Sequence, residues 1–170
     1  MKQLTSIQLK FQDREELSRS IEKWKIKDEK IIFTNGCFDI LHVGHISLLA
    51  AAKDLGGKLV IGLNSDSSVH TLKGEGRPIN DLESRATMLA SLKTVDAVIS
   101  FSEETPIDLI EWIKPDFLVK GGDYLKENIV GAEFVSKYGG RVVIVPLVEG
   151  FSTSELNAKT NNTNSVNQSI

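Results

Sequence analysis

Several features are scarce in this chain of 170 residues, and each scarcity argues against a class of protein. The single cysteine, Cys37, cannot form an internal disulfide, so we expect a protein of a reducing compartment. No apolar run approaches the roughly 20 residues that a membrane-spanning helix needs. The N-terminal segment also lacks the apolar core of a secretory signal. The sequence therefore predicts a cytoplasmic protein with no membrane partner.

Positive charge is limited as well. The chain has 20 Lys and Arg residues against 23 Asp and Glu, a formal net charge of −3. A nucleic-acid-binding protein first needs positive charge against the phosphates, so no nucleic-acid partner is expected, although a small basic pocket can still exist. Hydrophobic residues make up 41% of the chain and charged residues 25%, so a normal globular core can form.

Short apolar or β-branched runs alternate with segments of helical spacing. Strands are expected at residues 30–35, 58–64, 96–101, 117–120 and 141–145, and helices at 45–55, 82–93, 106–113 and 128–138. This alternation predicts βαβ units, because parallel strands need long crossovers. The expected fold is α/β, a Rossmann-like three-layer sandwich with a five-stranded parallel sheet. In such sheets the ligand lies outside the carboxyl ends of the strands.

The two ends of the chain differ from this middle part. Residues 11–24 combine a helical pattern with many charges, which predicts an extra amphipathic helix on the outside of the sheet. Residues 160–170 are almost wholly polar and cannot bury enough apolar surface to offset the entropy of ordering. We therefore expect an N-terminal helical extension (1–29), one domain (30–159) and a disordered polar tail (160–170).

The first expected strand leads into the string TNGCFDILHVGH, in which two histidines flank a glycine. His42 and His45 are three residues apart, with His45 at the start of the next helix, so both imidazoles face one side of the turn. Gly36 and Gly44 let the backbone approach a ligand closely. The helix N-terminus adds free N–H groups and the positive end of the helix dipole. The spacing predicts a phosphate cradle with two extra donors.

Other interpretations of these residues stay open at this point. A histidine near a strand end is commonly a capping or packing residue, although two around a glycine are harder to explain in that way. A zinc site would need a third ligand, and the sequence has no HExxH pattern. Cys37 fits a small buried residue better than a nucleophile.

The string HVGH, preceded by TNGCFD, resembles the HxGH signature of the nucleotidylyltransferase superfamily. The match continues through GLNSDSSV, LKGEGRP, ESRATML, VKGGDY and GFSTS and covers about residues 30–154. Together these motifs are similar to the D-glycero-β-D-manno-heptose 1-phosphate adenylyltransferases, the nucleotidyltransferase domain of the bifunctional heptose enzymes. No sugar-kinase domain is recognisable in the sequence, so a stand-alone form is expected.

The resemblance implies that residues 30–159 form a nucleotidylyltransferase domain that transfers AMP from ATP to the heptose 1-phosphate, giving ADP-heptose and pyrophosphate. A sugar phosphate is ionised near neutral pH, so it needs no general base, and catalysis would rest on positioning and charge stabilisation. The superfamily uses Mg²⁺ with the triphosphate. Its protein ligands here are unknown, since phosphates and water commonly hold this ion. Dimers are common in the superfamily, so a homodimer is expected.

The resemblance also implies roles for individual residues. By the family pattern, His42 and His45 are the catalytic pair that holds the triphosphate. The expected nucleotide and phosphate contacts are Thr34, Asn35, Gly36, Cys37, Phe38, Lys120, Gly121, Asp123, Ser152, Thr153 and Ser154. The expected acceptor contacts are Asp39, Asn64, Asp66, Lys73, Arg77 and Arg85. On the residues alone, positions 152–154 fit an ordinary helix N-cap equally well. Each of the cations Lys73, Arg77 and Arg85, taken singly, fits a solvated basic face.

Alternatives to this function also stay open. A glycerol-phosphate cytidylyltransferase or a GDP-heptose-forming enzyme would use the same site, because one sequence reveals little about base choice. A non-catalytic nucleotide-binding module belongs to another class, and the intact pair of His42 and His45 argues against it. Release of pyrophosphate separates an enzyme from a binding module.

Overall fold

The computed structural model describes residues 2–122 and 124–146. The strands are β1 (Ile31–Gly36), β2 (Lys58–Asn64), β3 (Ala97–Phe101), β4 (Phe117–Gly121) and β5 (Arg141–Val145). The helices are α1 (Lys2–Gln8), α2 (Arg14–Ile26), α3 (Val43–Lys53), α4 (Asp66–Lys73), α5 (Leu82–Ser91), α6 (Ile107–Ile113), the 3₁₀ turn η1 (Lys126–Asn128) and α7 (Ala132–Lys137). None of these described helices combines the length and the apolar character that crossing a membrane requires.

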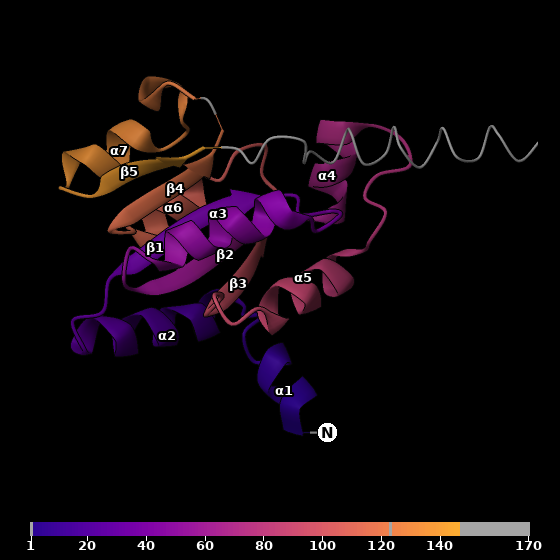
Figure 1. Cartoon of the computed structure of the whole chain (residues 1–170), viewed down its shortest axis with the longest axis horizontal. Coiled ribbons are helices and arrows are strands. Elements are labelled where there is room, and N and C mark those ends of the chain that lie inside the picture. Colours follow the sequence, from indigo (N-terminus) through magenta and orange to yellow (C-terminus); the bar gives the residue numbers. More distant parts are fainter. Residues whose placement is uncertain (1, 123, 147–170) are drawn as a thin grey trace, which may run out of the picture.

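The strands form one parallel sheet in the order β3-β2-β1-β4-β5 (Figure 1). The chain winds from β1 through β2 to β3 at one edge, then crosses over to β4 and β5 on the other side of β1. The direction of winding therefore reverses between β1 and β4. In doubly wound sheets this reversal opens a crevice at the carboxyl ends of the two strands. The predicted α/β, Rossmann-like fold with a five-stranded parallel sheet is confirmed.

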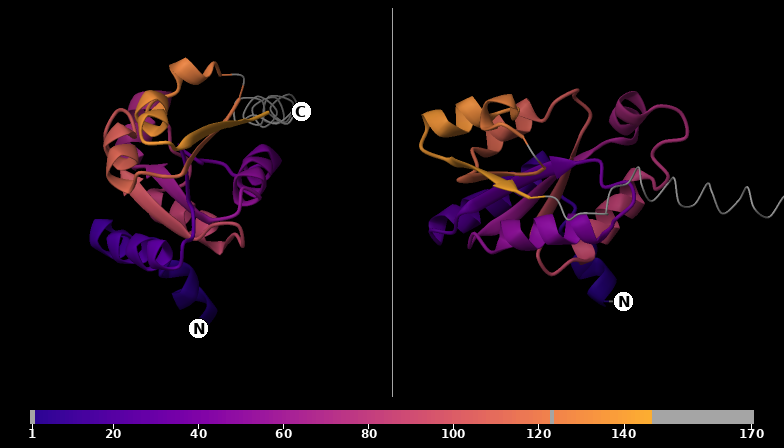
Figure 2. Two further views of the ribbon diagram at one scale, coloured as in Figure 1. Left: turned by 90° about the vertical axis from the view of Figure 1, so that its left-hand side faces the viewer. Right: turned by 45° about the horizontal axis from the view of Figure 1, so that its top comes forward.

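Helices cover both faces of the sheet, so the molecule has three layers (Figures 1 and 2). On one face, α3 and α5 bury Leu49 and Leu89 in a cluster with side chains of β1, β2 and β3. On the opposite face, α2, α6 and α7 bury Leu17, Ile110 and Val135 in a second cluster. The N-terminal α2 thus contributes to the same core as residues beyond position 30.

The N-terminal region forms two helices, whereas the sequence pattern predicts one over residues 11–24. The break falls before α2, where Asp13 is the N-cap: its side chain accepts from the Glu16 backbone at 2.8 Å, and the Glu16 carboxylate accepts from the Asp13 backbone at 3.1 Å. This capping box starts a new helix at residue 14. The chain just before it runs beside β3, where Val98 donates to the Lys10 carbonyl at 2.7 Å and accepts from the Gln12 N–H at 2.9 Å.

Two more elements differ from the sequence-based expectation. The helix expected at 128–138 is a 3₁₀ turn followed by α7, because Gly131 between them has φ +84° and a Cβ there would lie 2.8 Å from Ile110. The α4 helix was not predicted. Half of its eight residues are serine, threonine or aspartate, which favour caps and turns over helix interiors. Ser65 nevertheless caps it by accepting from the Ser68 N–H.

Removing the Leu17 side chain tests whether α2 belongs to the core. Leu17 is completely buried, so Leu17→Ala is expected to lower the free energy of unfolding by about 2–5 kcal/mol. The urea midpoint of the purified variant measures this loss. Leu9, which is 67% exposed, provides the matched control, since Leu9→Ala should change stability by no more than about 0.5 kcal/mol. Equal midpoints for both variants would show that α2 is dispensable.

Candidate active site

A cavity of about 400 Å³ lies at the reversal of winding between β1 and β4. Most of the residues that the sequence predicts to contact nucleotide line it. They are Thr34, Asn35 and Gly36 at the end of β1, Cys37 and Phe38 in the next loop, His42 and His45 at the start of α3, and Lys120 and Gly121 at the end of β4. Lys73, from the last turn of α4, reaches the same cavity. The topology thus brings together residues that are far apart in the sequence, such as Thr34 and Lys120, which are 86 positions apart.

The two histidines stack on each other at the N-terminus of α3. Their ring centroids lie 3.7 Å apart with the planes at 26°. His42 is the N-cap residue, and its backbone N–H donates to Nδ1 of His45 at 3.4 Å. That contact uses Nδ1 of His45 as an acceptor, so the proton of the neutral ring lies on Nε2. The predicted placement of both imidazoles on one side of the turn is what the structure shows.

The environment of the pair keeps both rings neutral. Burial lowers the pKa of His45 to about 4, the neighbouring charges of His42 and Lys73 add to this, and a hydrogen bond to the Ile40 backbone opposes it. The pKa of His42 is also lowered, first by burial and then by Lys73. At neutral pH each ring is therefore a hydrogen-bond donor without charge.

Lys120 is the buried cation of the cavity. Its ammonium group donates to Oδ1 of Asn35, so the bond joins the ends of β4 and β1 across the crevice. Burial lowers the pKa of Lys120 to about 8. The side chain is therefore mainly charged at pH 7, and an anion in the cavity would stabilise that charged form.

Two polar atoms in the cavity wall are buried and lack a partner within residues 2–122 and 124–146. They are the Thr34 hydroxyl oxygen and Nδ1 of His42. Buried polar groups are nearly always hydrogen-bonded, because an unsatisfied group costs about 1–3 kcal/mol. Both atoms come from segments that the sequence assigns to phosphate binding. A ligand with oxygen atoms at this position would satisfy them.

Asp39 and Arg77 form a buried ion pair beside the cavity. Nε of Arg77 lies 2.9 Å from Oδ2 of Asp39, whose side chain has no exposed surface. Oδ1 of Asp39 accepts from the backbone N–H groups of Ile79 at 2.7 Å and Asn80 at 3.2 Å. Asp39 therefore holds the segment after Arg77 in place. Nη1 of Arg77 is buried without a hydrogen-bond partner in the described part of the chain.

Arg85, Asn64 and Asp66, which the sequence predicts to contact the acceptor substrate, form a separate hydrogen-bond network. Arg85 is fully buried, and its guanidinium bonds to the Asp66 carboxylate at 2.6 Å and to the Asn64 carbonyl at 2.8 Å. The Asn64 side chain donates to the Ser68 hydroxyl at 2.9 Å. The side chains of Arg85 and Asn64 are thus hydrogen-bonded to other residues of the chain, while the Asp66 carboxylate is half-exposed. Their contact with an acceptor stays a prediction.

Some predicted residues lie outside the described residues, and the structure adds others. Asp123, Ser152, Thr153, Ser154 and the tail at 160–170 belong to the first group. Leu48, Tyr124 and Pro146 line the cavity and were not singled out from the sequence. Tyr124 ends the VKGGDY string, and Leu48 lies three residues after His45 on α3, so motif position and helical spacing could have identified both.

The thiol of Cys37 is protonated at neutral pH. Burial is the main cause that raises its pKa, although the charges of Lys73 and Arg85 act in the opposite direction. The thiolate is the nucleophilic form of cysteine, so this environment disfavours nucleophilic chemistry at Cys37.

The described residues contain no group of three His, Cys, Asp or Glu side chains that could hold a metal ion. The cavity wall over the same residues has donors and cations but no carboxylate. A protein-held Mg²⁺ therefore does not fit this part of the chain. A larger hollow of about 860 Å³ runs along α7 and β5, but it lies away from the reversal of winding and includes none of the predicted site residues.

The charge of Lys120 gives a testable pH dependence. For the nucleotide transfer that the sequence leads us to expect, kcat/KM should fall as pH rises through about 8, because Lys120 then loses its proton. Lys120→Arg should move this fall to higher pH, since a guanidinium stays charged. Lys25→Arg, an exposed lysine in the last turn of α2, is the control. A fall at the same pH in Lys120→Arg would assign it to another group.

The cavity presents hydrogen-bond donors and cations at the N-terminus of a helix, which suits phosphate groups rather than neutral ligands. Together with the sheet order, this chemistry places the protein in the class of doubly wound α/β proteins with a phosphate-binding site at the reversal of winding. More narrowly, the chain belongs to the cytidylyltransferase-like family, whose model matches residues 33–165.

Comparison with individual proteins agrees with this assignment. The chain is 54% identical over 149 residues to the Bifunctional protein HldE of Koribacter versatilis, a match that covers 88% of this chain and 31% of the relative. It is 49% identical over 154 residues to the protein of the same name from Caulobacter vibrioides, covering 91% and 32%. The chain thus spans about a third of the length of these relatives.

A solved structure also matches the fold. The lipopolysaccharide core biosynthesis protein from Thermoplasma volcanium GSS1 has a TM-score of 0.57 and 32% sequence identity to this chain. The match covers 71% of this chain and 97% of the other.

Proposed function

We propose that this chain transfers AMP from ATP to a sugar phosphate, D-glycero-β-D-manno-heptose 1-phosphate, and releases pyrophosphate and ADP-heptose. The observation that carries the nucleotide part is the stacked histidine pair at the N-terminus of α3. Beside it, Nδ1 of His42 and the Thr34 hydroxyl are buried without partners in the described chain. A triphosphate supplies the oxygen atoms that these groups need.

The proposed reaction is an in-line displacement at the α-phosphorus. An oxygen of the acceptor phosphate forms the new bond to this phosphorus, and the bond to the oxygen that bridges to the β-phosphorus breaks, so that its electrons leave with pyrophosphate. The acceptor phosphate is already ionised, so no proton has to be removed. His42 and His45 donate to the phosphate oxygens as neutral groups, and Lys120 offsets negative charge.

Mg²⁺ would enter with the nucleotide. It commonly keeps phosphate and water ligands, which agrees with a cavity wall that has no carboxylate among the described residues. The steps assigned to His42, His45 and Lys120 are the binding and orientation of phosphate groups by donors of this chain.

The names of similar proteins and two sequence motifs support a heptose phosphate as the acceptor substrate. The relatives carry the name Bifunctional protein HldE, and the solved structure is titled as a lipopolysaccharide core biosynthesis protein. The motifs LKGEGRP and VKGGDY resemble those of heptose 1-phosphate adenylyltransferases. Lys73 and Arg77, whose Nη1 has no partner among the described residues, are the cations on the side of α4 that would hold the acceptor phosphate.

A second candidate follows from the description of the matching family, which is cytidylyltransferase-like. It is transfer of CMP from CTP to glycerol phosphate at the same site. The chemistry at the α-phosphorus would be identical, because the histidine pair contacts phosphate groups and not the base. Only the choice of donor and acceptor separates the two candidates.

The deciding experiment measures pyrophosphate release by the purified chain. ATP, CTP and GTP are each combined with heptose 1-phosphate, glycerol 3-phosphate and buffer, in the presence of Mg²⁺. Release only with ATP and heptose 1-phosphate supports the proposal, and release only with CTP and glycerol 3-phosphate supports the second candidate. Nucleotide binding without release from any pair would identify a binding module.

A further inference from the structure

Arg85 ties together three segments of the chain, the loop after β1, the junction between β2 and α4, and the loop before α5, from a fully buried position in α5. Its Nη1 donates to the carbonyl of Cys37, just after β1, at 2.7 Å and to that of Asn64, the last residue of β2, at 2.8 Å. Nε donates to the Asn80 carbonyl at 3.0 Å, and Nη2 donates to the Asp66 carboxylate at 2.6 Å. The guanidinium has no exposed surface, and every hydrogen bond that the structure gives it is to another residue of the described chain.

The Cys37 carbonyl that Arg85 holds belongs to a strained stretch of backbone. The next residue, Phe38, has φ +45°, a left-handed conformation that costs a residue other than glycine of order 1–3 kcal/mol. Such a conformation persists only where its surroundings fix it. Gly36 contributes by leaving room, since a Cβ there would lie 3.2 Å from the Phe38 ring.

The strained residue contacts one member of the histidine pair, His45. The Phe38 ring is 4% exposed, and its centroid lies 5.0 Å from that of His45 at an angle of 54°. His45 in turn stacks on His42. A continuous series of contacts therefore runs from the Arg85 guanidinium through the Cys37–Phe38 peptide to both rings.

We propose that Arg85 is a positioning residue that holds the Cys37–Phe38 peptide in its left-handed turn and thereby aligns the His42–His45 pair. What that alignment does in turnover rests on the proposed function, whereas the alignment itself does not. A lysine cannot replace Arg85 in this role. It is a single point charge, and the planar fork of arginine reaches several acceptors in fixed directions.

The test compares wild type with Arg85→Lys by NMR titration of the histidine rings, which needs no turnover. The chain has three histidines, so the spectrum is simple, and His70, exposed on α4, is the internal reference. The wild-type pKa of His45 is about 4 because the ring is buried beside His42 and Lys73. In Arg85→Lys the pair should lose its alignment and the His45 titration should move upward. The kcat of pyrophosphate release should also fall about 10²-fold, the effect of a misplacement of roughly 1 Å.

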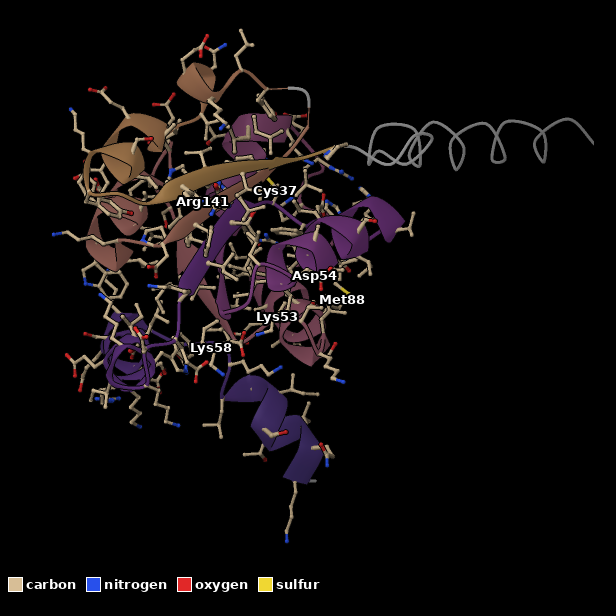
Figure 3. All side chains as sticks on the ribbon, turned by 60° about the vertical axis from the view of Figure 1, so that its left-hand side comes forward. Cys37, Lys53, Asp54, Lys58, Met88 and Arg141 are labelled. Carbon is tan, nitrogen blue, oxygen red and sulfur yellow. The ribbon has the colours of Figure 1, made fainter. Side chains whose placement is uncertain are left out.

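Two further variants separate positioning from stability. Lys53→Met removes a cation that binds the Gly57 carbonyl and the Asp96 carboxylate, and Figure 3 shows Lys53 well apart from Cys37. It should lower the melting temperature and leave the His45 titration unchanged. Phe38→Leu removes the ring contact between Phe38 and His45, so it should shift the pKa of His45 in the titration while Arg85 is intact.

The outcomes decide the proposal separately from the proposed function. A folded Arg85→Lys protein with an unchanged His45 titration and an unchanged kcat overturns the role of Arg85. If Arg85→Lys does not fold, the Phe38→Leu variant decides. An unchanged His45 titration in that variant would show that the Cys37–Phe38 turn does not align the histidine pair. Absence of pyrophosphate release from wild type would contradict the proposed function, yet the titrations would still report on the alignment.

Discussion

The His45→Ala variant is expected to turn over about 10²–10³-fold more slowly than the wild type. A neutral N–H donor that tightens as negative charge grows on the transferring phosphate contributes most in the transition state, and loss of one such donor has an effect of this size. The low pKa of His45 keeps this donor uncharged at neutral pH. The measurement is kcat for pyrophosphate release at saturating ATP and acceptor.

The third histidine of the chain provides a matched control. His70 is exposed on α4, so His70→Ala removes the same chemical group away from the cavity and should keep wild-type turnover. His45→Ala should also keep the fold, because the ring lies at a helix start and not in either core cluster. Turnover within a few-fold of wild type in His45→Ala would contradict the phosphate cradle.

The second large effect is expected in the choice of acceptor. With ATP as donor, kcat/KM for heptose 1-phosphate should exceed that for glycerol 3-phosphate by about 10⁴–10⁵-fold. A site built to hydrogen-bond substrate hydroxyls leaves buried groups unpaired when a smaller acceptor binds, and such mismatch has this magnitude. Nη1 of Arg77, buried and without a partner in the described chain, is a group that a smaller acceptor would leave unpaired.

The same comparison includes a third acceptor, whose structure lies between those of heptose 1-phosphate and glycerol 3-phosphate. Glucose 1-phosphate carries the anomeric phosphate and most ring hydroxyls but lacks the seventh carbon, so its kcat/KM should fall between the two. A faster reaction of CTP with glycerol 3-phosphate than of ATP with the heptose would make the substrate assignment wrong. The displacement at the α-phosphorus would then still stand.

The fold could be predicted from local patterns because the sheet strands are apolar runs with glycine-rich boundaries. The run at 58–64 coincides with β2, and 141–145 coincides with β5. Prediction failed where side-chain chemistry outside the apolar pattern decides the structure. Asp13 and Glu16 start α2 by a capping box, and Ser65 starts α4 although the residues that follow are poor helix formers.

The sequence could predict which residues lie at the candidate site, but not which of them are hydrogen-bonded to other residues of the chain. Thr34, His42 and Lys120 were each expected near phosphate, and the topology brings all three to one cavity. The sequence could not reveal that Asp39 and Arg85 would be buried with protein partners, because charged residues are almost always exposed. Their burial depends on acceptors from distant strands and loops, which only the folded chain brings within reach.

The stretch between α1 and α2 shields the outer edge of β3 from other chains. An open edge strand offers unpaired N–H and C=O groups to any extended segment, which makes it a template for aggregation. Here Lys10 and Gln12 already occupy both groups of Val98, and the Lys10 ammonium also binds the carbonyls of Leu92 at 3.2 Å and Val95 at 2.8 Å. Without residues 9–12, the N–H and C=O of Val98 would be open, and strand addition of a second copy at β3 is the expected consequence.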